Sequence, residues 1–316
     1  MNQLKATLLS VSVILILLNI LVSCGERSPS SPSAPKNTLT ATCTSTTTST
    51  PTNTRTPHYF TIADSTLDAS VRATVGIPQP QPLSREDIAS VYDLYVNGGV
   101  STLSGIENLT GLMYLTIQNC PLLTDISPLS SLTGLITLSL HGCTAVTDIS
   151  PLIYLTSLSS LYLGAYGDPS SKIPDLTPLD SLTGLYSLHM QGRSLTNSDL
   201  TYIFSHTSLT SLDLSGNPGI TDISGVSALT SLTYLILSGT GISDISSLSG
   251  LLNLNQLLLR YCASLENISA LVTNALAGGL GSGDRVFLEG TVLSAQGEAD
   301  AETLINTYGV QVYYTP

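Results

Sequence analysis

Residues 112–129 read "LMYLTIQNCPLLTDISPL", and residues 135–152 read "LITLSLHGCTAVTDISPL". Each copy opens with L-x-x-L-x-L or its isoleucine variant, carries a cysteine eight residues after the first leucine and closes on "DISPL". Repeats of this length predict a solenoid, because one unit is too small to bury its own leucines and must stack on its neighbours. The same opening recurs at intervals of 22 to 27 residues, in copies that begin at Leu158, Leu185, Leu209, Leu232 and Leu254.

Each repeat divides into a strand and a return segment. The alternating end of the opening predicts a short strand, with leucines on one face and variable residues on the other. The "DISPL" segment predicts the turn that follows. Its Ser or Thr is placed to cap a short helical turn, and its proline occupies the first helical position, where no N–H is needed. The capping residues would be Ser127, Ser150 and Thr177.

The array resembles the leucine-rich-repeat family, and the phrase "TDISPLxxLTxL" resembles its internalin-like bacterial class. This resemblance extends from about residue 59 to the C-terminus. It implies an α/β fold, a right-handed horseshoe with a concave parallel β-sheet and short helical or 3-10 segments on the convex side. It also implies a helical cap in front of the first repeat, which would cover the leucines at that end.

The two ends of the array fit such caps. Apolar residues at helical spacing and the capping-box-like pair Ser84 and Asp87 lie in residues 58–90. The repeats then occupy residues 91–282, beginning with the weaker copy "VYDLYV". Residues 283–316 predict an irregular last repeat, a helix and a closing strand. The apolar residues of the N-terminal cap are Leu67, Val71 and Val75.

The first residues carry a targeting signal. Lys5 precedes an apolar run, and Leu21-Val22-Ser23-Cys24 resembles the lipobox of bacterial lipoproteins, where the peptide is cut before a cysteine that then carries lipid. This predicts a signal peptide over residues 1–23 and a membrane anchor on Cys24. The alternative is an uncleaved membrane helix, which also places the rest of the chain outside the cytoplasm. We expect an extracytoplasmic, membrane-anchored bacterial lipoprotein, at the outer membrane or the cell surface.

Residues 24–57 are rich in Ser, Thr and Pro and predict a disordered tether. Such a tether has a root-mean-square span of roughly 30 Å. It would lift the folded part off the membrane. Cys43 lies within it and has no partner in the sequence pattern, so an incidental thiol is the expected interpretation.

The repeated cysteines belong to one position, eight residues after each opening leucine. In the family this position is an inward ladder that supports the turn after the strand, and cysteine would act there as a small buried hydrophobe. A Cys120–Cys143 disulfide stays open, because the predicted compartment is oxidising. A zinc site is less favoured, because Cys262 lies five repeats beyond Cys143. The ladder contains Cys120, Cys143, Tyr166, Arg193, Asn217, Thr240 and Cys262.

A second ladder consists of aspartates. Each is expected to accept backbone N–H groups in its own turn, as Asp commonly does. A stacked row of carboxylates that binds calcium is the alternative. The members are Asp125, Asp148, Asp175, Asp222 and Asp244.

Composition narrows the function. The net charge is −12, only 10% of residues are charged and no basic stripe is present, which argues against nucleic-acid binding. No serine elbow, phosphate loop or HExxH motif is found, and His141 and His189 lie two repeats apart in different rows. His58 lies at the junction of the tether and the N-terminal cap, and His206 lies in a convex insert. A carboxylate pair for glycoside hydrolysis stays open, although no residues nominate one. The sequence predicts neither catalysis nor a cofactor.

The variable strand positions are the candidate contact surface. Tyr offers a large contact area and a hydroxyl at low entropic cost, although tyrosines also suit strands in general. The resemblance implies binding of a protein partner through the concave sheet. The alternative is a structural or adhesive envelope component that binds polysaccharide or self-associates. The candidate residues are Tyr95, Tyr114, His141, Tyr162, His189, Asp213, Tyr234, Ile236, Leu258 and Arg260.

Overall fold

The structure is a computed structural model that describes residues 58–165 and 171–315. The chain divides into two compact units, Met1–Thr54 and Arg55–Pro316, and the described residues belong to the second. The lipobox cysteine Cys24, the tether with Cys43 and the ladder residue Tyr166 lie outside the described residues. The expectations attached to them stay predictions.

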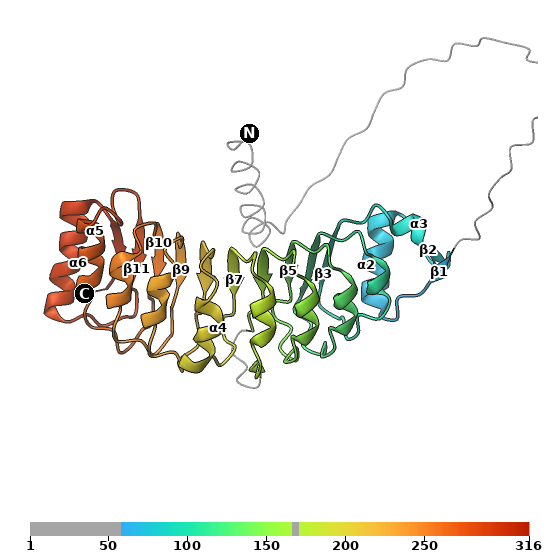
Figure 1. The fold of residues 1–316 in the computed structure, drawn as a ribbon, viewed down its shortest axis with the longest axis horizontal. Coiled ribbons are helices and arrows are strands. Elements are labelled where there is room, and N and C mark those ends of the chain that lie inside the picture. Colours follow the sequence, from blue (N-terminus) through green and yellow to red (C-terminus); the bar gives the residue numbers. More distant parts are fainter. Residues whose placement is uncertain (1–57, 166–170, 316) are drawn as a thin grey trace, which may run out of the picture. The chain divides into compact units, whose positions relative to one another are not determined.

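Ten short strands form one parallel sheet, in which each strand pairs with its neighbours in the sequence from β3 at one edge to β12 at the other. This order confirms the predicted stacking of one strand per repeat, and Figure 1 shows the strands side by side along the array. The strands are β3 (Asp93–Asn97), β4 (Tyr114–Gln118), β5 (Thr137–Ser139), β6 (Ser160–Tyr162), β7 (Ser187–His189), β8 (Ser211–Asp213), β9 (Tyr234–Ile236), β10 (Gln256–Leu258), β11 (Arg285–Phe287) and β12 (Gln311–Tyr313).

The register of the sheet follows the leucines. Leu115 pairs with Leu138, and Leu138 pairs with Leu161, so the second leucine of each repeat stands beside its counterpart. All three side chains are fully buried. Because side chains alternate along a strand, this inward row forces the variable residues to the solvent side of the sheet.

The return segments are short helices on the other side of the leucine core, as predicted. Most are five-residue 3-10 helices, and three of them carry the expected proline in their first turn. They are η1 (Ile106–Asn108), η2 (Ser127–Ser131), η3 (Ser150–Tyr154), η5 (Thr177–Ser181), η6 (Asn197–Asp199), α4 (Leu200–Phe204), η7 (Ser224–Ala228), η8 (Ser246–Gly250) and α5 (Ser269–Leu276).

The capping of these turns differs from the prediction. Ser127, Ser150 and Thr177 are the first residues of their helices, and no side-chain hydroxyl caps them. Instead, an aspartate two residues earlier accepts the backbone N–H of that Ser or Thr at 2.8–2.9 Å. This confirms that Asp125, Asp148, Asp175, Asp222 and Asp244 serve their own turns.

The predicted N-terminal cap contains two helices. Helix α2 (Ser65–Val75) starts at Asp64, whose carboxylate accepts the backbone N–H groups of Thr66 and Leu67. Helix α3 (Arg85–Ile88) starts with the expected capping box of Ser84 and Asp87. Strands β1 (Tyr59–Phe60) and β2 (Leu83–Ser84) pair antiparallel beside them. Leu67 and Val71 of α2 are fully buried, so this helix covers the first leucines, as predicted.

The other end is closed by α6 (Ala295–Tyr308), which ends at Gly309 in the left-handed conformation with a φ of 72°. Glycine adopts this backbone without strain, and it turns the chain directly into β12. Figure 1 shows α2 and α6 at opposite ends of the array. The helix and the closing strand were both predicted.

The inward ladder is confirmed for each of its described members, all of which are buried. The Asn217 side chain donates to the carbonyls of Met190 and Leu214 at 3.1 and 2.8 Å and accepts the N–H of Leu195 at 3.0 Å. Cys120, Cys143 and Cys262 are free buried thiols. Burial raises the pKa of the Cys143 thiol to about 12, so this thiol is unreactive at neutral pH.

Arg193 is the unexpected member of the ladder. Its side chain is fully buried, and its Nη1 donates to the carbonyls of Val146 and Ser171, each at 3.0 Å. Nη2 donates to the carbonyl of Cys143 at 3.3 Å, and Nε donates to the carbonyl of Leu163. Burial lowers its pKa to about 10, which still leaves the guanidinium charged at neutral pH. Four carbonyl dipoles, from two earlier repeats, therefore stabilise this cation.

Replacing Arg193 with alanine should lower the free energy of unfolding by about 3 kcal/mol or more, because several buried carbonyls lose their donors. Urea unfolding followed by circular dichroism measures this change. Arg85→Ala is the matched control, since Arg85 is exposed and should change stability by no more than about 0.5 kcal/mol. Equal unfolding midpoints for the two variants would show that the buried guanidinium does not stabilise the array.

Candidate functional site

The candidate site is the solvent side of the parallel sheet, which we call the sheet face. Residues on it form three rows that run across the strands, and the strand register aligns each row residue by residue. The middle row is Tyr95, Thr116, Ser139, Tyr162, His189, Asp213, Ile236, Leu258, Phe287 and Tyr313.

Every residue proposed from sequence as a contact lies on this face. Tyr114 and Tyr234 occupy the row before the middle one, and His141 and Arg260 lie two residues after the ends of β5 and β10. Side chains of the sheet face gather into three groups with different chemistry. They are a tyrosine patch at the N-terminal end, a polar centre and a platform at the C-terminal end.

The tyrosine patch comprises Tyr95 and Tyr114, both of them exposed, and the residues just before β3 and β4, Tyr92 and Met113, are exposed as well. Tyr95 keeps 59% of its surface accessible, which is high for an aromatic side chain in a sheet. The backbone N–H of Met113 donates to the carbonyl of Tyr92 at 2.9 Å, so these two residues extend the strand ladder by one position. Sequence reasoning missed both, because it counted only positions inside the strand pattern.

The polar centre is built around His189 on β7. Its ring lies 4.7 Å from the ring of Tyr162, centroid to centroid, at an angle of 51°. His189 Nε2 is 3.2 Å from the hydroxyl of Ser211, and Nδ1 is 3.9 Å from Asp213 Oδ2. Burial, together with the nearby His141, lowers the pKa of His189 to about 4, so the imidazole is neutral at pH 7.

A second contact in the centre bridges the gap left by Gly164. The side-chain amide of Gln191 lies across this glycine and approaches His141 Nδ1 at 3.4 Å. A Cβ at position 164 would stand 2.3 Å from Gln191 Cδ, so the contact requires glycine there. The two histidines, two repeats apart, are nevertheless close enough for His141 to lower the pKa of His189, which sequence spacing alone did not reveal.

Asp213 departs from its predicted role. It is only 6% exposed, because its carboxylate accepts the N–H of Ser215 at 2.9 Å and faces His189. Burial raises its pKa. This residue is therefore placed to hold its neighbours, and it offers a partner little surface of its own.

Ser211, His189 and Asp213 together resemble a hydrolytic triad in composition, but the geometry does not favour acyl transfer. The Asp213 carboxylate is too far from the imidazole for a hydrogen bond, and a histidine with a pKa near 4 is a weak base. The flanking backbone N–H groups of Met190 and Leu214 donate within the sheet, at 2.8 and 2.9 Å. They are thus unavailable to an oxyanion. The arrangement suits stacking and hydrogen bonding.

The C-terminal platform, formed by Ile236, Leu258, Arg260, Phe287 and Tyr313, covers the last four strands. The guanidinium of Arg260 lies 4.6 Å from the centre of the Phe287 ring, and Tyr313 stacks on the same ring at 4.7 Å and 8°. Arg260 also binds Glu289 through two hydrogen bonds of 2.8 and 3.1 Å. These hydrogen bonds are the main cause that raises the pKa of Arg260 and lowers that of Glu289.

Phe287 and Tyr313 were not proposed from the sequence. The segment Arg285–Glu289 reads "RVFLE", and its Val286 and Leu288 repeat the alternation of the earlier strands. Both side chains are fully buried, as the leucines of other repeats are. Matching this half-pattern, rather than the whole L-x-x-L-x-L opening, would have placed Phe287 in the middle row.

The histidine on the opposite side is structural. His206, which was assigned to a convex insert, is only 6% exposed. Its backbone N–H donates to the carbonyl of Ile203, and its carbonyl accepts the N–H of Leu209. Leu132 makes the same two backbone hydrogen bonds, with Leu129 and Leu135, in an earlier repeat. It therefore occupies a leucine position of the core. Burial lowers its pKa.

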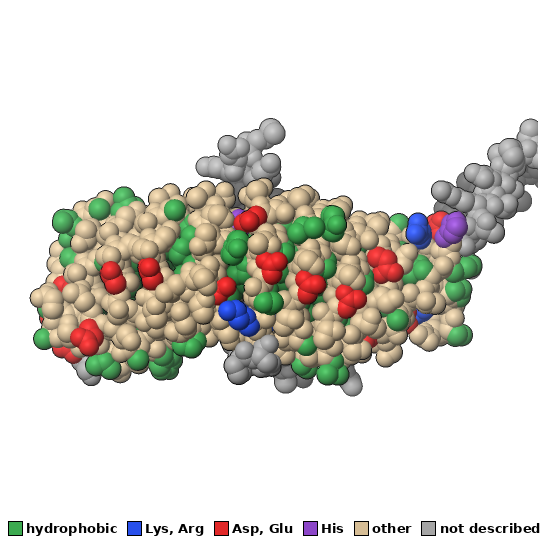
Figure 2. Space-filling view, turned by 60° about the horizontal axis from the view of Figure 1, so that its bottom comes forward, with side chains coloured by type: hydrophobic (Ala, Val, Ile, Leu, Met, Phe, Trp, Pro, Cys, Tyr) green, Lys and Arg blue, Asp and Glu red, His purple; other side chains and the backbone are tan. Residues whose placement is uncertain are grey.

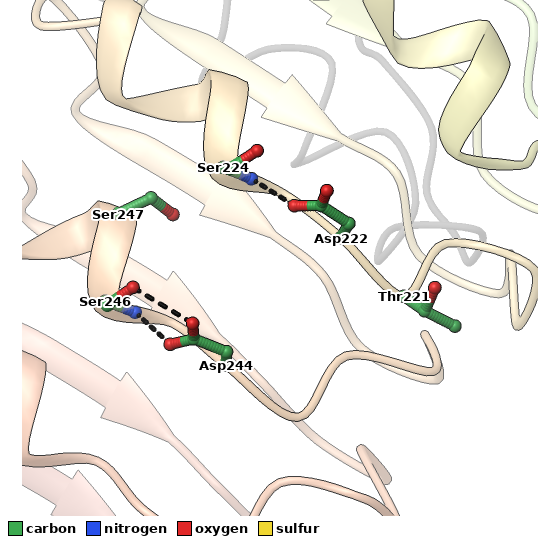
Figure 3. Close-up of a pocket in the computed structure, with 6 residues that line it drawn as sticks. All are labelled: Thr221, Asp222, Ser224, Asp244, Ser246 and Ser247. Carbon is green, nitrogen blue, oxygen red and sulfur yellow. Dashed lines mark hydrogen bonds between the residues drawn. The ribbon is translucent and has the colours of Figure 1, made fainter.

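The helical side of the array carries a polar hollow of about 300 Å³ between η7 and η8. Figure 3 shows its two carboxylates turned toward their own helices, where Asp222 accepts from Ser224 and Asp244 from Ser246. Figure 2 shows acidic side chains spaced along the surface of the array. In residues 58–165 and 171–315, no group of three or more His, Cys, Asp or Glu is arranged to hold a metal ion. The hollow is lined by Thr221, Asp222, Ser224, Asp244, Ser246 and Ser247.

Within the described part of the chain, no helix has both the length and the apolar character that crossing a membrane requires.

Comparisons with known proteins agree with the fold. The family model described as "Leucine Rich repeat" matches residues 205–229. No curated protein matches the chain. Among solved structures, internalin C2 from Listeria monocytogenes has a TM-score of 0.51 and 22% identity, covering 80% of this chain and 94% of its own.

Two further solved structures are similar. A leucine-rich-repeat protein of Leptospira interrogans has a TM-score of 0.50 and 17% identity, covering 71% of this chain and 62% of its own. An internalin encoded by inlF of Listeria monocytogenes has a TM-score of 0.44 and 25% identity, covering 81% of this chain and 91% of its own. The chain thus has a leucine-rich-repeat fold with internalin-like structural neighbours from bacteria.

The lowered pKa of His189 predicts how stability depends on pH. The unfolded chain binds a proton near pH 6.5 and the folded protein only near pH 4, so stability is lost as the pH falls between these values. The loss should approach about 1.4 kcal/mol per pH unit. Urea unfolding at pH 7 and pH 5 measures it.

A His189→Asn variant should show a clearly smaller difference between the two pH values, whereas His58→Asn, at an exposed position, should behave as the parent. An unchanged pH difference in His189→Asn would contradict the burial of a neutral imidazole.

Proposed function

We propose that the protein recognises a protein partner through the sheet face, without catalysis. The observation that carries this proposal is the set of exposed tyrosines and half-buried apolar side chains on one face of the sheet. Tyr95 is 59% exposed and Tyr313 is 43% exposed, at opposite ends of the middle row. Clustered exposed aromatic residues of this kind mark interaction surfaces in soluble proteins.

The two sides of the array differ in a way that supports this choice of face. On the helical side, the carboxylates of the repeated turns are occupied by backbone N–H groups of the same turns. On the sheet face, each strand contributes variable side chains, and the backbone of the strand already pairs with its neighbours through hydrogen bonds. These side chains can change without loss of fold, which is what recognition of a particular partner requires.

We further propose that the protein is held at a bacterial membrane by lipid on Cys24, with residues 24–57 as the tether. The support is the lipobox-like sequence and the Ser/Thr/Pro-rich composition that follows it. The partner would then lie outside the cytoplasm. A recognition module on a tether samples a larger volume than one fixed at the membrane surface.

The partner-binding proposal predicts loss of capture when tyrosines of the sheet face are removed. The full chain, purified in detergent, is crosslinked to envelope or host-cell extracts and compared with a Tyr114/Tyr162/Tyr234→Ser variant. The variant should capture at least about tenfold less of the same protein, since each buried interface tyrosine typically contributes 1 kcal/mol or more.

Tyr154→Ser is the matched control, because Tyr154 is an exposed tyrosine of η3 on the opposite side. It should retain the partner, and circular dichroism should show both variants folded. Equal capture by parent and triple variant would refute binding through the sheet face. Retention of glycans without any protein would favour the polysaccharide-binding alternative.

The anchor proposal predicts that Cys24→Ala abolishes labelling of the protein by radioactive palmitate and releases it from the membrane fraction. Lipid is attached through the thiol, which alanine lacks. Cys43→Ala, a neighbouring cysteine of the same segment, should keep both label and location. Membrane association that persists in Cys24→Ala would instead indicate an uncleaved helix.

A further inference from the structure

The C-terminal platform carries one cation that no described group neutralises. Arg285 is exposed on the sheet face of β11, between Gln256 and Gln311 in register, and forms no salt bridge with any described residue. Its sequence neighbour Asp284 is occupied in its own turn, where its carboxylate accepts the N–H of Gly281 at 2.8 Å. Because the chain carries a net charge of −12, an exposed cation without a salt bridge on the sheet face is a notable feature.

An apolar strip lies directly beside it. Ile236, Leu258 and Phe287 follow one another on adjacent strands, at a spacing of about 4.8 Å, and all three are half-buried. Phe287 lies two residues after Arg285 on the same face of β11, which places the two side chains about 7 Å apart. A binding partner can therefore contact the Arg285 cation and the apolar strip at the same time.

The Phe287 ring of the strip is held in place before a partner binds. Arg260 covers one part of the Phe287 ring and is itself fixed by two hydrogen bonds to Glu289, while Tyr313 stacks on the ring in parallel. Binding to such a surface costs little side-chain entropy. Because Arg260 is committed to Glu289, the charge available to a partner is that of Arg285.

We propose that the platform binds a segment of a protein partner in which an apolar side chain lies one or two residues from a single carboxylate. The apolar side chain packs on Leu258 and Phe287, and the carboxylate pairs with Arg285. A broadly acidic partner does not fit, because the chain as a whole is negative and repels it. This inference rests on the proposed function and specifies the chemistry of one of its contact regions.

A random peptide library displayed on phage, selected against the full chain in detergent, tests the proposal. Enriched peptides should combine an aromatic or aliphatic residue with a nearby Asp or Glu. Synthetic versions should bind Arg285→Glu at least tenfold more weakly than the parent, and Phe287→Ala likewise. Arg85→Glu, which makes the same charge change at an exposed position of the N-terminal cap, should bind them as the parent does.

Other outcomes overturn the inference. Enriched peptides without a carboxylate, or peptides indifferent to Arg285→Glu, would show that the cation is not used. Peptides lost only in a Tyr95/Tyr114→Ser variant would place recognition at the tyrosine patch, which refutes the platform but leaves the proposed function intact. If no peptide is enriched and uronic-acid oligosaccharides bind in a way that depends on Arg285, the ligand of the platform is a glycan and not a protein.

Discussion

One repeat of this chain cannot bury its own leucines, and the whole architecture follows from that constraint. A segment of about 23 residues has a few apolar side chains and a strand whose backbone N–H and C=O groups are unpaired on both edges. Both are completed only by the next repeat, which pairs its strand and stacks its leucines in register. Since an array built this way has two unfinished ends, α2 and α6 are as necessary as the repeats themselves. Leucine burial, strand pairing and the two caps leave the side chains of the sheet face free to vary.

Features that recur with the repeat could be predicted from the sequence. The periodicity locates each feature that has a fixed place in the repeat. These features are the strand register, the inward ladder and the hydrogen bond by which Asp125 holds its own turn. What the pattern does not contain could not be predicted. The path of the Arg193 side chain depends on carbonyls in two earlier repeats. The Gln191–His141 contact depends on the glycine at position 164, which the repeat pattern does not specify.

The candidate site was predicted as a face more accurately than as a set of residues. Alternation along a strand decides on which side of the sheet a side chain lies, and the strand residues proposed from the sequence share one side. Exposure after that is decided by neighbours on adjacent strands, as the burial of Asp213 beside His189 shows. The repeat also becomes irregular at its end, which hid Phe287 and Tyr313. Chemistry therefore changes along the face, from tyrosines through neutral polar groups to an aromatic and arginine stack.

Repeat arrays usually unravel one unit at a time, because each unit contacts only its neighbours. The buried guanidinium of Arg193 departs from that rule, since it connects its own repeat to carbonyls of the two repeats before it through a single side chain. Those repeats have to open together or not at all. Under tension applied between the two ends of the array, the chain should therefore peel from its ends and stop at a mechanical clamp in the middle. The central repeats would keep their structure after the flanks had given way.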